Sequence, residues 1–120
     1  MEYYKNEKGQ IAVLVSGCYG AGWSTWNVEE LAYDKRVVEF WLSVENDLDF
    51  LREVDRSENS QAARKTKDFL ASIGYFSVYL GGFADIHVEW VDAGQPFRID
   101  EYDGFESLVT LENTRFTTLV

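Results

Sequence analysis

Several residue types are scarce in this sequence, and each scarcity excludes a class of protein. The chain has one cysteine, so no disulfide can form within it. It has one proline and no low-complexity tract, which argues against long disordered segments. The longest uninterrupted apolar run, Ile11–Val15, is far too short to span a bilayer. Because the first ten residues also lack a secretory pattern, we expect a protein of a reducing cytoplasm with no membrane association.

Basic residues are scarce as well. The chain contains 11 lysines and arginines against 21 acidic residues, for a net charge of -10. Residues 81–120 contain eight of these acids and only two basic residues. This balance disfavours direct binding of nucleic acid, which requires clustered Lys and Arg to neutralise phosphates. The acidity either serves solubility or forms a surface that competes with nucleic acid for a basic partner protein.

The length and composition suit one self-sufficient domain. A chain of 120 residues can bury roughly two-thirds of its unfolded surface, so we expect residues 1–120 to form a single domain. Aromatic residues make up 16% of the chain. That is more than one small core usually needs, which leaves a homodimer interface open.

The middle of the chain has the signals of helices. Asp34, Asp47 and Ser60 each precede a segment with apolar residues at helical spacing. Gly74 is placed to end the last of these helices. Asn27, with a glutamate three residues later, resembles a capping box and predicts a further short helix over 28–33.

The two ends of the chain have the signals of strands. After Gly74 the period of the pattern changes to two, and Ile86, Val88 and Trp90 should share the inner face of one strand. Helices in the middle and strands at both ends predict an α+β fold. We expect a mostly antiparallel sheet with about three to four helices from the middle of the chain packed on one face. Strands are expected over 2–5, 10–16, 75–81, 84–91, 96–102, 107–111 and 114–120.

A glycine-rich loop, GCYGAGWSTWN at 17–27, follows the apolar strand. It has the strand–loop–helix context of a phosphate loop, but Trp23 stands where such a loop needs lysine. Two interpretations stay open. The loop is either a tight turn that covers the core, or a pocket whose backbone N–H groups and aromatic rings hold a small anionic ligand. The residues that would form this pocket are Tyr19, Gly20, Gly22, Trp23, Ser24, Thr25, Trp26 and Asn27.

The second segment of interest is DEYDGFE at 100–106, with four carboxylates among two aromatic rings. A calcium-binding loop starting at Asp100 would need glycine at its sixth position and glutamate at its twelfth, and both are missing. The segment is then either a solvated turn or a patch that presents carboxylates and rings to basic side chains. The residues of this candidate partner-binding patch are Asp100, Glu101, Tyr102, Asp103 and Glu106.

Chemistry by the single histidine is a minor hypothesis. Asp85, His87 and Glu89 should share one strand face, but alternate residues lie about 7 Å apart along a strand. That spacing is loose for chelating one ion and would need a fourth ligand from Asp100 or Glu101. We expect no metal and no cofactor. Cys18 has only His87 as an imidazole partner, so a catalytic pair depends on the fold, and we expect no catalytic residues.

Two segments, CYGAGWSTWN at 18–27 and FRIDEYDGFES at 97–107, resemble a group of small proteins encoded by tailed bacteriophages. The resemblance covers under a fifth of the chain and carries no known activity or site residue. It implies a small accessory phage protein in the host bacterial cytoplasm. Such proteins often antagonise host defence by stoichiometric binding.

These observations lead to one main hypothesis and two alternatives. The main hypothesis is a non-enzymatic antagonist of a host system whose acidic surface competes for a basic, nucleic-acid-binding host protein. The first alternative is a pocket protein that sequesters a small anionic ligand, such as a signalling nucleotide, in the glycine–tryptophan loop. The second is a virion assembly factor.

Overall fold

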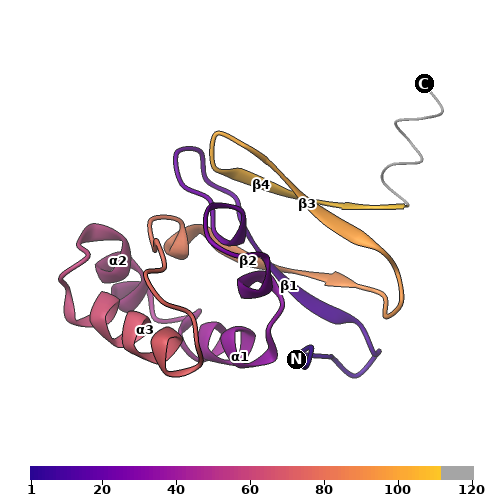
Figure 1. Ribbon diagram of the computed structural model, residues 1–120, viewed down its shortest axis with the longest axis horizontal. Helices are drawn as coiled ribbons and strands as arrows, with labels where there is room; N and C mark the ends of the chain where they lie inside the picture. Colours follow the sequence, from indigo (N-terminus) through magenta and orange to yellow (C-terminus); the bar gives the residue numbers. More distant parts are fainter. Residues whose placement is uncertain (112–120) are drawn as a thin grey trace.

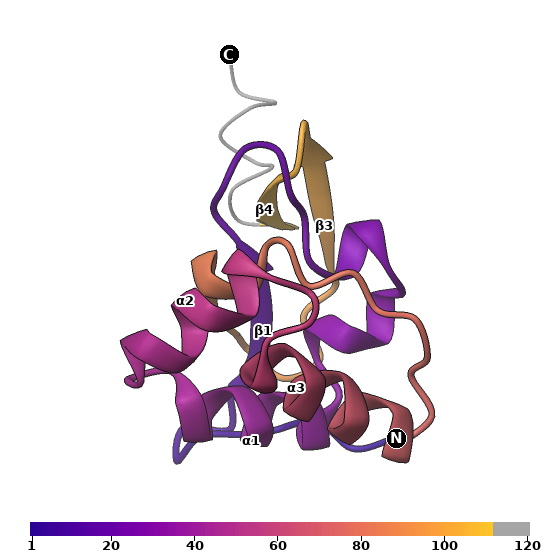
Figure 2. The same cartoon turned by 90° about the vertical axis from the view of Figure 1, so that its left-hand side faces the viewer.

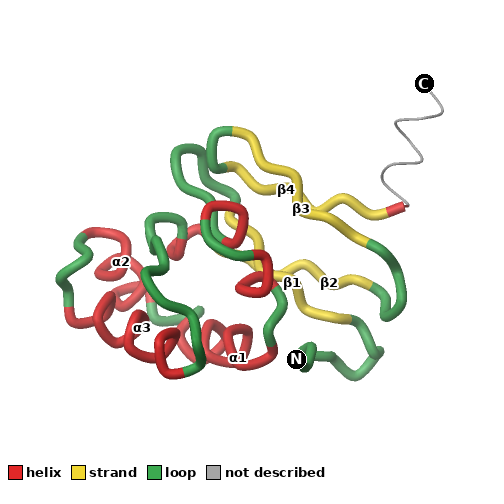
Figure 3. The backbone as a smooth tube through the Cα atoms, in the orientation of Figure 1, coloured by secondary structure: helices red, strands yellow, loops and turns green. Residues whose placement is uncertain are grey.

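The computed structural model describes residues 1–111 and has an α+β fold, as the sequence predicts. Three α-helices group on one side of the view in Figure 1, and a long β-hairpin extends from the other. Figure 3 separates the helical part from the strands by colour. In chain order the elements are β1 Ile11–Ser16, the 3-10 helices η1 Ser24–Trp26 and η2 Glu29–Ala32, α1 Lys35–Val44, α2 Leu48–Arg56, α3 Gln61–Ser72, the 3-10 helix η3 Phe83–Asp85, β2 Ile86–Val91, β3 Phe97–Tyr102 and β4 Phe105–Thr110.

Strand β1 is the centre of the molecule. All six of its residues are buried, which confirms the interior strand expected from its apolar run. Ala12 and Leu14 belong to one core cluster together with residues of the three α-helices. Val13 and Val15 belong to a second cluster, against which side chains of the β3–β4 hairpin pack. Because successive side chains of a strand point to opposite faces, β1 can be covered by helices on one face and by the hairpin on the other.

The predicted helix caps are confirmed. The side chains of Asp34, Asp47 and Ser60 accept hydrogen bonds from backbone amides in the first turns of α1, α2 and α3. Gly74 follows α3 with a φ of +100°, a conformation that glycine adopts without steric cost. Asp34 is buried and also accepts hydrogen bonds from Arg36 and from the hydroxyl of Tyr75, at 2.8 Å and 2.7 Å.

The strands form two small sheets. β1 pairs with β2 in antiparallel register from Ile11 opposite Val91 to Ser16 opposite Ile86. β3 and β4 form a separate antiparallel pair, joined by the turn at Asp103 and Gly104. Figure 2 shows this hairpin above the helices, beside the loop that leaves β1. The hairpin therefore packs against one face of β1 and does not add strands to the β1–β2 sheet.

Two predicted elements at the start of the chain are absent or altered. Residues 2–5 form no strand, and only isolated bridges join Tyr3 to Asp34 and Lys5 to Ile11. The helix predicted after Asn27 is the single 3-10 turn η2, which has no side-chain cap. The capping box does not form because the Asn27 side chain is bonded elsewhere, to the backbone of Tyr79.

The strand predicted over 75–81 is also absent. Ser77 has a φ of +58°, which interrupts an extended backbone. The N–H and C=O groups of Tyr79 bond to the Asn27 side chain instead of a neighbouring strand, at 2.8 Å and 3.0 Å. Trp90, expected on the inner face of β2, is partly exposed, and its ring lies against that of Tyr4. The strand predicted over 114–120 lies outside the described residues.

Candidate functional site

The loop at 17–27 and the tip of the β3–β4 hairpin form one structural unit. The amide of Gly20 donates to the carbonyl of Asp103 at 2.5 Å. Gly104 lies so close to the loop that a β-carbon added there would be 2.3 Å from the backbone nitrogen of Ala21, and its φ is +90°. No side chain fits at this position, so the glycine lets the loop wrap the hairpin tip.

Glu106 of β4 anchors the hairpin to the loop. It is only 2% exposed, and its Oε1 accepts a hydrogen bond from the amide of Ser16 at 2.8 Å. Its Oε2 accepts from the amides of Trp23 and Thr25, at 2.8 Å and 3.0 Å, and from the Thr25 hydroxyl at 2.6 Å. Backbone N–H groups that converge in this way form an anion site. The chain fills this site with its own carboxylate.

Glu101 of β3 makes a second, more exposed link between the hairpin and the loop, on the face of the hairpin that also carries Glu106. Glu101 and Glu106 are direct partners in the register of β3 and β4, so their side chains project from the same face of the hairpin. The Oε2 of Glu101 accepts from the indole nitrogen of Trp26 at 2.9 Å and from the amide of Gly104 at 2.7 Å. These two hydrogen bonds hold the pKa of Glu101 below its usual value.

The opposite face of the hairpin tip is open. Tyr102 is 77% exposed and pairs in register with Phe105. The ring of Tyr19 comes from the loop to lie 5.0 Å from the ring of Phe105. Asp103 occupies the turn with a φ of +50°, which aspartate tolerates better than most residues. We call Tyr19, Tyr102, Asp103 and Phe105 the tip patch.

The five residues predicted as one partner-binding patch are therefore divided between two faces. Asp100 and Tyr102 alternate with Glu101 along β3 and lie on the open face. The Asp100 carboxylate is already paired with the Nε of Arg98 at 2.8 Å. Glu106 faces the loop and is buried, so it is not available to a partner.

The eight residues predicted as a ligand pocket are brought together, but the polar groups of Trp23, Thr25, Trp26 and Asn27 bond within the protein. The buried Oγ of Ser24 has no hydrogen-bond partner. Trp23 is fully buried, and its indole donates to the carbonyl of Leu31 at 3.0 Å. Trp26 stacks on Tyr79 with ring centroids 5.7 Å apart. Asn27 bonds to the backbone of Trp23 and Tyr79. Tyr79 was not predicted to be part of this cluster, because the pattern at 75–81 suggested a strand.

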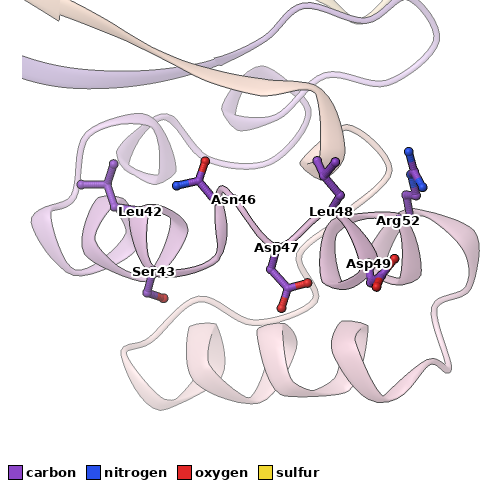
Figure 4. A pocket seen from close by; sticks show the side chains of 7 residues that line it. All are labelled: Leu42, Ser43, Asn46, Asp47, Leu48, Asp49 and Arg52. Carbon is purple, nitrogen blue, oxygen red and sulfur yellow. The ribbon is translucent and has the colours of Figure 1, made fainter.

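A separate hollow of about 650 Å³ lies at the junction of α1 and α2. Figure 4 shows that its side chains point in different directions: Leu42 and Asn46 project to one side, Ser43 and Asp47 to the other. The Asp47 side chain is already used to cap α2. The hollow therefore lacks the converging polar groups of a ligand site.

Cys18, Asp55 and Asp85 interact where the loop, α2 and η3 meet. Burial and Asp85 raise the pKa of the Cys18 thiol, and burial and Asp85 raise the pKa of Asp55 to about 6. His87 pairs with Glu89 at 3.1 Å on the exposed surface. Within residues 1–111, no three His, Cys, Asp or Glu side chains are placed to hold a metal ion together.

None of the helices within residues 1–111 has the length and apolar character that crossing a bilayer requires. No protein-family model matches this chain, and no curated protein or solved structure is significantly similar to it.

Proposed function

We propose that this chain is a non-enzymatic binding protein that uses the tip patch to occupy a basic, nucleic-acid-binding surface of another protein. The observation that carries the proposal is the exposure of Tyr102 on the hairpin tip and of Tyr19 on the adjoining loop, 77% and 64%. The other face of the tip is fixed to the body by Glu106. Exposed tyrosines are common anchors of protein interfaces. A net charge of -10 selects for a basic partner.

The anchoring of the tip favours tight binding. Glu106, Glu101 and the carbonyl of Asp103 all accept hydrogen bonds from the body of the protein or from the turn itself. A surface that is already ordered loses less conformational entropy on binding than a flexible loop does. The tip can therefore present rings and carboxylates in one fixed arrangement.

We further propose that the partner belongs to a bacterial host, and that the chain is a phage-encoded antagonist of a host defence system. The resemblance of 18–27 and 97–107 to phage proteins supports this context. The two segments that carry it are the loop and the hairpin that are joined through Glu106.

The alternative of a pocket for a small anionic ligand is less well supported. Such a ligand would need the amides of Trp23 and Thr25, and both already donate to Glu106. Trp23, the central ring of that hypothesis, is fully buried in the core. This arrangement favours binding to a protein over capture of a nucleotide.

Affinity capture from host lysate tests the proposal. The tip variant Asp100→Asn/Tyr102→Ala/Asp103→Asn is compared with the matched control Glu58→Gln/Asp68→Asn/Phe76→Ala, which removes two charges and one exposed ring away from the tip. We expect the wild type and the control to capture the same nucleic-acid-binding protein in equal molar amounts, and the tip variant to lose it. Duplex DNA or RNA and added salt should release the captured protein.

Three outcomes would contradict the proposal. Capture of the same protein by the tip variant and by the wild type would place the binding surface elsewhere. Capture of virion proteins alone would favour the assembly factor. If nucleotides raise the Tm of the wild type but not that of Trp26→Ala, the ligand pocket is favoured. A ligand at 100 times its Kd should add about 2.7 kcal/mol to the free energy of unfolding.

A further inference from the structure

The carboxylates near the hairpin tip differ in what they already bind. Glu106 is enclosed by loop donors, and Glu101 accepts from Trp26 and Gly104 through the same oxygen. Asp100 is held by Arg98 through two contacts, at 2.8 Å and 3.4 Å. Within residues 1–111, the side chain of Asp103 is the tip carboxylate with no hydrogen bond or ion pair of its own.

Three aromatic residues accompany Asp103 in the tip patch, and two of them, Tyr102 and Tyr19, are exposed. Tyr102 precedes Asp103 in the chain, and its partner in register is Phe105, against which Tyr19 lies. All three rings belong to the open face of the hairpin, while Glu101 and Glu106 project from the other face. The unpaired carboxylate of Asp103 and the exposed ring of Tyr102 therefore belong to adjacent residues at the tip.

We propose that the tip patch recognises an arginine side chain of the partner, with Asp103 pairing to the guanidinium and Tyr102 stacking against it. This inference rests on the proposed function and names the group that the patch selects. A guanidinium is planar, so it can lie on a tyrosine ring while its N–H groups reach a carboxylate. A lysine ammonium is a compact, strongly hydrated charge and gains less from the rings.

Two backbone contacts hold the hairpin tip in place, and both can be checked without any partner. The backbone carbonyl of Asp103 accepts a hydrogen bond from the Gly20 amide, and Gly104 lies against Ala21, so the backbone that carries Asp103 and Tyr102 is held in place. Asn at position 103 tolerates the same positive φ. The Asp103→Asn variant therefore removes the charge and keeps the turn.

The test titrates the full chain with hexa-arginine or hexa-lysine peptides at low salt. Backbone amide NMR monitors the binding of each peptide. We expect hexa-arginine to shift the amides of 102–104 and of Gly20, and to bind at least about threefold more tightly than hexa-lysine. Asp103→Asn should weaken hexa-arginine binding about threefold or more, while Asp68→Asn, with the same loss of one charge, should change it less than twofold. Tyr102→Ala should bring the arginine-to-lysine ratio close to one, and Phe76→Ala should leave it unchanged.

Equal affinity for the two peptides would overturn the inference. Chemical-shift changes that leave out the amides of 102–104, or an arginine-to-lysine affinity ratio that Tyr102→Ala leaves unchanged, would also overturn it. Failure of the inference and of the proposed function can be told apart. If the peptides show no preference but the triple tip variant still loses the captured host protein, the binding function holds and the arginine selectivity fails. If arginine selectivity holds but the tip variant still captures the host protein, the patch is selective but is not the surface that the function uses.

Discussion

The carboxylate of Glu106 accepts two hydrogen bonds from Thr25, which lies 81 residues earlier in the chain: one from its amide at 3.0 Å and one from its hydroxyl at 2.6 Å. Together with the amides of Ser16 and Trp23, these donors surround a buried negative charge. The contact joins the two segments that stand out in the sequence. It also explains how an acidic hairpin can lie against a loop rich in backbone donors.

Removing the charge of Glu106 should strongly destabilise the fold. Glu106→Gln replaces one accepting oxygen by an NH2 group that faces amide donors, so buried N–H groups lose their partner. We expect a loss of about 3 kcal/mol in the free energy of unfolding, measured by urea denaturation. Glu101→Gln is the matched control and should cost much less than Glu106→Gln, because Glu101 is exposed. Equal losses in the two variants would contradict the role assigned to Glu106.

Truncation of Glu106 should create a site for an external anion. In Glu106→Ala the four donors remain, and a small carboxylate such as formate or acetate can take the place of the lost side chain. We expect formate to raise the Tm of Glu106→Ala by more than it raises that of the wild type, with chloride at equal ionic strength as the control. A Tm that responds equally in both proteins would show that the donors do not persist as a site.

Two glycines with positive φ should respond differently to alanine. Gly104 and Gly94 have φ values of +90° and +84°, but an added β-carbon meets the backbone of Ala21 at Gly104 and nothing within 4 Å at Gly94. Gly94→Ala should therefore cost about 1 kcal/mol for the backbone conformation alone. Gly104→Ala should cost more than about 2 kcal/mol, because the hairpin tip must also move away from the loop. Comparable losses in urea denaturation would contradict the close contact.

The pKa of Asp55 should make a measurable contribution to the pH dependence of stability. Burial and Asp85 raise its pKa from 3.8 to about 6 in the folded protein. The folded state thus binds the proton more tightly than the unfolded state, so the contribution of Asp55 to stability is favourable below about pH 4 and is lost as pH rises through about 6. Asp55→Asn should therefore stabilise the protein at pH 7 relative to the wild type.

The difference between Asp55→Asn and the wild type isolates this group from the other acids. We expect it to shrink steadily from pH 7 to pH 4 in urea denaturation. Asp85→Asn should reduce the same pH dependence, because it removes the neighbouring charge that raises the pKa of Asp55. A difference that stays constant over this range would contradict the interaction.

Much of the helical part could be predicted from local signals. The caps at Asp34, Asp47 and Ser60 act within one turn of the residues they stabilise, so the sequence alone identifies them. The strand at 75–81 and the capping box at Asn27 were predicted wrongly for one shared reason. The Asn27 side chain bonds to Tyr79, 52 residues away, and a local pattern contains no information about that contact.

The candidate site was predicted in part. The alternation of β3, with a two-residue turn at Asp103 and Gly104, already implies that Glu101 and Glu106 share a face opposite Tyr102 and Phe105. Taking the five acidic-segment residues as one patch overlooked this alternation. What the pattern could not provide is which of the two faces would be buried.

By itself, the sequence determined the α+β class, the buried central strand, the caps of the three α-helices and the acidic character of the hairpin. The tertiary structure alone decided that the donors of the glycine–tryptophan loop bind Glu106, and that Tyr102 and Asp103 remain exposed. The physical reason is that periodicity and capping depend on neighbours along the chain. The pairing of a buried carboxylate with distant amides depends on how the β3–β4 hairpin packs against β1.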